Sequence, residues 1–169
     1  AKFATDFREM IGIQLLQALT VGQKYYLSFY VNNSRDSSSH YNAASNKMGA
    51  KFLTTAYSQA SPIPIDNFAH IYSDSIITDS INWIKISGSF IANLAYQYLA
   101  IGNFFSDSTC THILLDSLAS MAYYYIDDVK LSTDSDFVNS IHAIDNIDLV
   151  QIFPNPARDW IVVEGRNIT

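Results

Sequence analysis

Apolar and polar residues alternate along much of the chain with a period of two. The clearest segment is Gln23–Asn32. One face of this segment carries Tyr25, Leu27, Phe29 and Val31, and the other carries Tyr26, Ser28, Tyr30 and Asn32. Successive side chains of a β-strand point to opposite sides, so the pattern predicts a strand with one buried face and one wet face.

The segment before this strand alternates in the same way, with apolar residues at Ile11, Ile13 and Leu15. The residues Ala18–Gly22 that follow are typical of a turn. We therefore expect Ile11–Leu15 to form a strand that pairs antiparallel with Gln23–Asn32.

Five further strands are predicted from alternation or from short apolar runs. In Trp83–Ala92 we expect a β-bulge at Gly88, and Ser61–Pro64 predicts a loop because proline has no N–H for a ladder. No segment sustains a period of 3.6 residues, so we predict an all-β fold, an antiparallel β-sandwich with little helix. The further strands are Met48–Phe52, Phe68–Tyr72 as an edge strand, Trp83–Ala92, Gln97–Phe105 and Ala122–Leu131.

The alternation ends at Leu131, and this change divides the chain. Residues 1–131 are predicted to form the sandwich, and the polar and acidic residues 132–148 a linker. Residues 149–169 begin a second unit that is too short to own a core, so we expect it to be truncated.

Composition and charge narrow the function classes. Hydrophobic residues make up 49% of the chain, which predicts a globular fold, and the net charge of −6 disfavours nucleic acid as a partner. No run approaches the roughly 18 to 20 apolar residues that span a bilayer, so no membrane-spanning segment is expected. With Cys110 as the one cysteine, an intrachain disulfide and a multi-thiolate zinc site are excluded.

A compact motif lies near the end of the chain. Its two prolines fix φ and lack N–H donors, and the alternation after it predicts the start of an edge strand. The motif consists of Phe153, Pro154, Asn155, Pro156, Ala157 and Asp159, followed by the apolar residues Ile161–Val163.

This segment resembles the opening of the type A C-terminal sorting domain of proteins exported by the type IX secretion system of Bacteroidota. The resemblance implies the first strands of a small Ig-like β-sandwich. It also implies the type IX secretion machinery as a partner, and a location that is secreted or on the outer cell surface.

A second resemblance covers Phe7–Leu131, which is similar to a carbohydrate-binding-like jelly roll often found ahead of such sorting domains. It implies a jelly-roll β-sandwich that is incomplete here, because the family's first strands precede the matching pieces. These pieces are Arg8-Glu9, Gly22–Phe29, Trp83–Gly88, Ile101–Phe104 and Tyr124–Val129.

Asp127 and Asp128 are the candidate metal ligands. In calcium-stabilised jelly rolls similar to this one, an Asp of the last strand helps to bind a structural Ca²⁺, which requires several oxygen ligands. Adjacent strand residues point to opposite faces, so both carboxylates can reach one ion only if a bulge intervenes or one residue contributes its carbonyl. The alternative is that these acids cap turn amides or face solvent.

Four tyrosines are candidate ligand-binding residues, because sugar rings stack on exposed aromatic planes. Tyrosine is also common on sandwich surfaces and between sheets, which is the structural alternative. The four are Tyr26, Tyr30, Tyr123 and Tyr125.

Nothing in the sequence supports catalysis, and we expect the chain not to be an enzyme. It contains no Gly-x-Ser-x-Gly elbow and no spaced histidine pair. Asp79 and Asp107 could act together on a glycoside only if the fold brings them close, and the sequence gives no distance between them. The function expected first is a non-catalytic binding module for a glycan or another cell-surface component. The alternatives are a structural spacer or adhesin-like surface domain, and an accessory region of a secreted hydrolase.

Overall fold

The chain divides into two compact units, Ala1–Asn139 and Ser140–Thr169. In the second unit the structure describes an antiparallel pair of short strands, with Ile152 opposite Val163. The computed structural model describes residues 6–35, 42–58, 60–117, 119, 121–139, 151–153 and 162–164.

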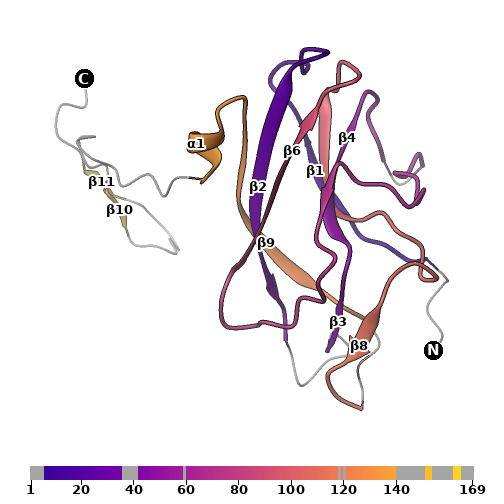
Figure 1. The fold of residues 1–169 in the computed structure, drawn as a ribbon. Coiled ribbons are helices and arrows are strands. Elements are labelled where there is room, and N and C mark those ends of the chain that lie inside the picture. Colours follow the sequence, from indigo (N-terminus) through magenta and orange to yellow (C-terminus); the bar gives the residue numbers. More distant parts are fainter. Residues whose placement is uncertain are drawn as a thin grey trace. The chain divides into compact units, whose positions relative to one another are not determined.

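The first unit is an antiparallel β-sandwich, which confirms the predicted fold class (Figure 1). One sheet has the strand order β1-β7-β4-β5 and the other the order β6-β2-β9, with a small β3-β8 ribbon beside them. The elements are β1 (Ile11–Gln14), β2 (Lys24–Asn33), β3 (Ala43–Ser45), β4 (Met48–Leu53), β5 (Ile71–Tyr72), β6 (Ile84–Ile91), β7 (Tyr98–Asn103), β8 (His112–Leu114), β9 (Tyr124–Ser132), α1 (Ser135–Asn139), β10 (Gln151–Phe153) and β11 (Val162–Glu164).

The core lies between the two sheets and follows from the alternation. Leu27, Phe29 and Val31 on the inner face of β2 have no exposed surface. They belong to one buried cluster with the inner residues of β4 and β7, including Phe52 and Ile101. Each such side chain stabilises the fold by about 1.5–3 kcal/mol through removal from water.

The predicted pairing of the first two strands is wrong. β1 pairs with β7, whereas β2 pairs with β6 and β9, so β1 and β2 lie in different sheets. The connection between them follows the segment before β7, where Leu15 N donates to Gln97 O and Leu19 N donates to Tyr96 O, both at 2.8 Å. These long-range bonds carry the chain from one sheet to the other.

The bulge predicted at Gly88 is also wrong. The register of β2 and β6 runs without a break from Lys24 opposite Ile91 to Val31 opposite Ile84. A Cβ atom at Gly88 would lie 3.2 Å from two carbons of Ile71, so the glycine allows β5 and β6 to approach closely.

The first part of the segment predicted as a linker is folded. β9 continues to Ser132, and α1 follows directly. The side chain of Val138 in α1 is 2% exposed, and its carbonyl accepts a hydrogen bond from Ser28 Oγ at 3.2 Å. The first unit therefore extends to Asn139.

His70 holds the end of β4 next to the short strand β5. Its backbone N donates to Ala50 O at 2.9 Å, and its Nδ1 accepts from Phe52 N at 3.1 Å. Aromatic rings surround the imidazole at centroid distances of 4.9 to 5.4 Å, namely those of Phe52, Phe68, Phe90 and Tyr96.

Burial, with a smaller contribution from the Lys51 ammonium, lowers the pKa of His70 from 6.5 to about 4. Protonation would place a proton on the Nδ1 that accepts from Phe52 N. The neutral imidazole is thus the form that the fold requires.

We expect the stability of the protein to fall between pH 6.5 and pH 4 because of His70. The unfolded chain takes up a proton near pH 6.5, whereas the folded chain does so near pH 4, so acid favours unfolding by about 2 kcal/mol after allowance for solvent screening. Denaturant unfolding at a series of pH values measures this loss.

The matched variant is His70→Asn, whose side-chain oxygen can accept from Phe52 N but does not titrate. It should unfold with a shallower pH dependence than the unsubstituted chain over the same range. Identical pH profiles for the two proteins would contradict the role of His70.

Candidate functional site

Three of the four candidate tyrosines lie on the outer face of the β6-β2-β9 sheet. In the strand register Tyr26 is opposite Ser89, Tyr30 is opposite Asp127, and Asn32 is opposite Tyr125. Directly opposed residues share a face of the sheet, so Tyr26, Tyr30 and Tyr125 point to the same side. The fourth candidate, Tyr123, precedes β9 and is 45% exposed.

This face is less open than the sequence predicts. Ser28, between Tyr26 and Tyr30, has no exposed surface, and Asn32 is 8% exposed. The Asn32 Nδ2 donates to Asn82 O at 3.1 Å. Tyr26 and Tyr30 are half-buried, whereas Tyr125 is 57% exposed.

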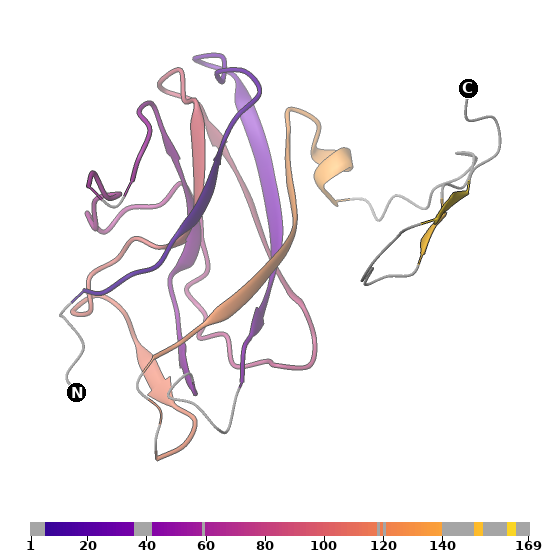
Figure 2. The same cartoon turned by 180° about the vertical axis from the view of Figure 1, so that it is seen from behind.

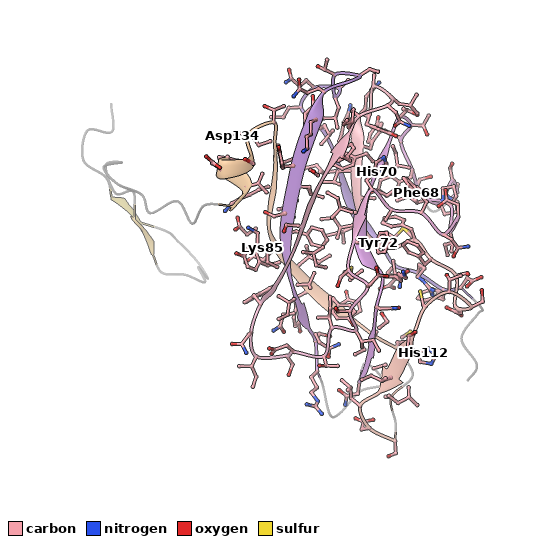
Figure 3. The ribbon with its side chains drawn as sticks, in the orientation of Figure 1. Phe68, His70, Tyr72, Lys85, His112 and Asp134 are labelled. Atoms are coloured by element: carbon pink, nitrogen blue, oxygen red, sulfur yellow. The ribbon has the colours of Figure 1, made fainter. Side chains whose placement is uncertain are left out.

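Helix α1 borders the face. The Val138 carbonyl accepts from Lys85 Nζ at 3.0 Å as well as from Ser28 Oγ, so residues of β6 and β2 both hold it. Figure 3 labels Lys85 on the side of the sandwich that carries α1, and His70 on the other side.

A shallow, open depression of about 180 Å³ lies where α1 meets the sheet. The tyrosine ring supplies an apolar surface, and two exposed serines of β6 supply hydroxyl groups. The depression is lined by Tyr26, Ser87, Gly88, Ser89 and Val138.

Asp127 and Asp128 stand at a β-bulge in β9. Ser28 pairs with Lys130 but Tyr30 pairs with Asp127, so Asp128 and the next residue together face a single residue of β2. Asp128 has a φ of 47°, a left-handed conformation that suits a bulge. The bulge that two carboxylates would need in order to share an ion is therefore present.

Both carboxylates nevertheless have partners in the protein. Asp127 Oδ1 accepts from Asp128 N at 2.7 Å, and Asp128 Oδ2 forms an ion pair with Lys130 Nζ at 3.0 Å. In the part of the chain that the structure describes, no group of three or more His, Cys, Asp or Glu side chains could hold a metal ion. In this arrangement the two residues fall short of the six to eight oxygen ligands of Ca²⁺, and the calcium site stays a prediction.

The two acids considered for glycoside hydrolysis have structural partners. Asp79 accepts from the backbone N–H and the side-chain amide of Asn82 and from the backbone N–H of Ile81, and these bonds lower its pKa. Asp107 accepts a hydrogen bond from Asp6 N and forms an ion pair with Arg8 at 2.8 Å. Both interactions lower the pKa of Asp107. A general acid needs a raised pKa, so neither carboxyl group has the property that acid catalysis requires.

Most of the predicted sorting motif lies outside the described residues. Pro154, Asn155, Pro156 and Asp159 are among those outside, and Phe153 is the last residue of β10. Comparisons of the chain with family models, with curated proteins and with solved structures found no match. No described helix is long and apolar enough to cross a membrane.

Val138 was not among the residues predicted for this site. A helix of five residues leaves no periodic pattern, so α1 had no signal. Ser87 and Ser89 do have a sequence signal. They alternate with Ile86 and Phe90 and therefore fall on the outer face of β6.

We expect Val138→Ala to lower the free energy of unfolding by about 2 kcal/mol, because two buried methyl groups are lost at the contact that docks α1. Denaturant unfolding measures the loss. Val129→Ala is the matched control, since Val129 is 44% exposed and the same change there should cost about 0.5 kcal/mol or less. Equal losses for the two variants would show that α1 is not held by Val138.

Proposed function

We propose that the first unit is a non-catalytic module that binds a glycan on the outer face of the β6-β2-β9 sheet. The observation that carries the proposal is the placement of Tyr26 in the wall of an open depression whose other side chains include Ser87 and Ser89. A sugar ring combines an apolar face, which stacks on an aromatic ring, with hydroxyl groups that need donors and acceptors. This depression offers both.

A second tyrosine extends the surface along β2. Tyr30 lies two positions from Ser28 on the same face, between Lys85 of β6 and Asp127 of β9. Consecutive residues on one face of a strand are about 6.6 Å apart. Tyr26 and Tyr30 are separated by two such steps, with Ser28 between them, so they are spaced for more than one sugar ring. The charged neighbours of Tyr30 supply further hydrogen-bonding groups.

The face also carries positive charge, although the chain as a whole has a net charge of −6. Lys24 Nζ lies 5.1 Å from the ring centre of Tyr26, and Lys85 and Lys130 are opposite β2 residues of this face. The ligands to be tested therefore include both neutral glycans and glycans with acidic sugars.

A structural spacer is the second candidate function. It is favoured by the cover over Ser28 and Asn32, which reduces the area of this face that a ligand can reach. A spacer has no need of an exposed aromatic surface, so mutation of the tyrosines separates the two functions.

We also propose that the protein is exported by a type IX secretion system to the cell surface or beyond. The support is the motif from Phe153 to Asp159 and the alternation after it. Glycan binding by the first unit would suit that destination, and the two proposals are tested separately.

The double variant Tyr26→Ala/Tyr30→Ala should lose at least tenfold in affinity for the glycan class that the unsubstituted chain retains on a glycan array, because each lost stacking surface contributes about 0.5–1.5 kcal/mol beyond its burial. Tyr72→Ala is the control, since Tyr72 is 40% exposed and belongs to the other sheet. Binding that survives the double variant, or a folded chain that binds no glycan, would favour the spacer.

Calcium is tested by melting the chain in calcium and in chelator. If Asp128 helps to bind Ca²⁺, Asp128→Asn should lower the melting temperature in calcium and have little effect in chelator. Asn tolerates the left-handed backbone at this position, and an exposed ion pair with Lys130 contributes at most about 1 kcal/mol. Equal shifts in both buffers would contradict a calcium role for Asp128.

A further inference from the structure

The outer face of the β6-β2-β9 sheet continues beyond the depression and beyond the helix that borders it. The Val138 carbonyl holds α1 at Ser28, and Asn32 lies four residues farther along β2, about 13 Å away at the rise of a strand. In Figure 2, α1 lies by the end of β9 that leads into it, and the start of β9 lies at the opposite end of the sandwich. The far part of this face is therefore outside the cover of α1.

Two exposed aromatic residues flank Asn32 on this far part. Tyr125 of β9 is opposite Asn32 and is 57% exposed. Trp83, which is 45% exposed, directly precedes Ile84, and Ile84 is opposite the inner residue Val31. The alternation of a strand thus brings Trp83 to the outer face beside Asn32. Neighbouring strands are about 4.8 Å apart, so the backbones of the two aromatic residues are about 10 Å apart across β2.

The next row of residues towards α1 adds a carboxylate to these rings. Tyr30 is opposite Asp127, which is exposed. An ionised carboxylate has about four acceptor positions, and the backbone N–H of Asp128 uses one of them. On the other side of Tyr30, Lys85 donates to the Val138 carbonyl. Asp127 can therefore accept further hydrogen bonds from hydroxyl groups beside an aromatic ring.

The composition of this face favours a glycan over a protein partner. Its rows of opposed residues carry aromatic, hydroxyl, amide and charged side chains, and none of these rows contains an aliphatic side chain. The core of a protein interface is depleted of charged residues, whereas a sugar ring needs an aromatic plane with polar groups beside it. The rows are Ser89, Tyr26 and Ser132; Ser87, Ser28 and Lys130; Lys85, Tyr30 and Asp127; and Asn32 and Tyr125 with Trp83 beside them.

We propose that Trp83, Tyr125 and Asp127 form a second sugar-binding subsite on this face, and that its ligand is a neutral sugar. The inference rests on the proposed glycan-binding function and deepens it. A sugar that stacks on one of the two rings presents its hydroxyl groups to the Asp127 carboxylate, which accepts hydrogen bonds and donates none. An acidic sugar would bring a like charge to the same place. The subsite therefore selects neutral sugars.

The first experiment screens the chain on a glycan array and then measures the strongest retained neutral glycan by calorimetry. The double variant Trp83→Ala/Tyr125→Ala should bind this glycan roughly tenfold more weakly, because two stacking surfaces are lost. The matched control is Phe7→Ala/Tyr72→Ala, which removes two exposed aromatic rings that do not belong to this sheet. The control should bind as the unsubstituted chain does.

The outcomes separate the subsite from the proposed function. Binding that is weakened by Tyr26→Ala but unchanged in Trp83→Ala/Tyr125→Ala would overturn the subsite and leave glycan binding at the depression in place. A folded chain that retains no glycan would overturn both. Tighter binding of acidic than of neutral glycans would overturn the ligand class assigned to the subsite.

Asp127→Asn tests the carboxylate without the loss of a ring. The asparagine oxygen can still accept from Asp128 N, so the β-bulge keeps its hydrogen bond. We expect the affinity for the neutral glycan to fall by roughly threefold or more, because a neutral acceptor forms weaker hydrogen bonds than an ionised one. The preference for neutral over acidic glycans should fall as well. An unchanged affinity and preference would overturn the role of Asp127.

Fluorescence shows whether the sugar reaches Trp83. Trp83 and Trp160 are the two tryptophans of the chain, so the tryptophan emission of a Trp160→Phe variant comes from Trp83. Titration of this variant with the neutral glycan should change the emission with the midpoint that calorimetry gives. Constant emission while calorimetry detects binding would place the sugar away from Trp83 and overturn the subsite.

Discussion

The first unit depends on β2, because this strand is bonded along both edges, buried on its inner face and partly covered on its outer face. Its inner face supplies Leu27, Phe29 and Val31 to the core, and its two edges bond to β6 and β9. Its outer face is partly covered as well, since Ser28 is bonded to the carbonyl of Val138. A strand at the centre of its sheet thus sets the core, the sheet order and the position of α1 together.

The period of two was sufficient to find the main strands, because alternation is local to each strand. It could not show how the strands are arranged. The separation of β1 from β2 rests on Leu15 and Leu19 bonding to the segment near Gln97, and no local pattern encodes a partner some eighty residues away. Gly88 shows the same limit, since its role depends on Ile71 in the other sheet.

The candidate site was predictable to the extent that it lies on a regular strand. Tyr26 and Tyr30 shared a face in the sequence pattern, and the register places them so. The cover over Ser28 was not predictable, because it comes from α1, a helix too short to show a period. His70 was missed for a related reason, because its Nδ1 replaces a backbone acceptor at the end of β4, a role that requires the strand to be in place.

The contact of Gly88 with Ile71 limits which substitutions each of the two positions can accept during evolution. A side chain at position 88 would occupy space next to the Ile71 side chain, since an added methyl group there lies 3.2 Å from the isoleucine. A larger residue at position 88 is tolerable where position 71 has become smaller, and an interior packed this closely gives either change alone little room. Positions 71 and 88 are therefore a coupled pair, and substitutions at the two should be inherited together in related chains.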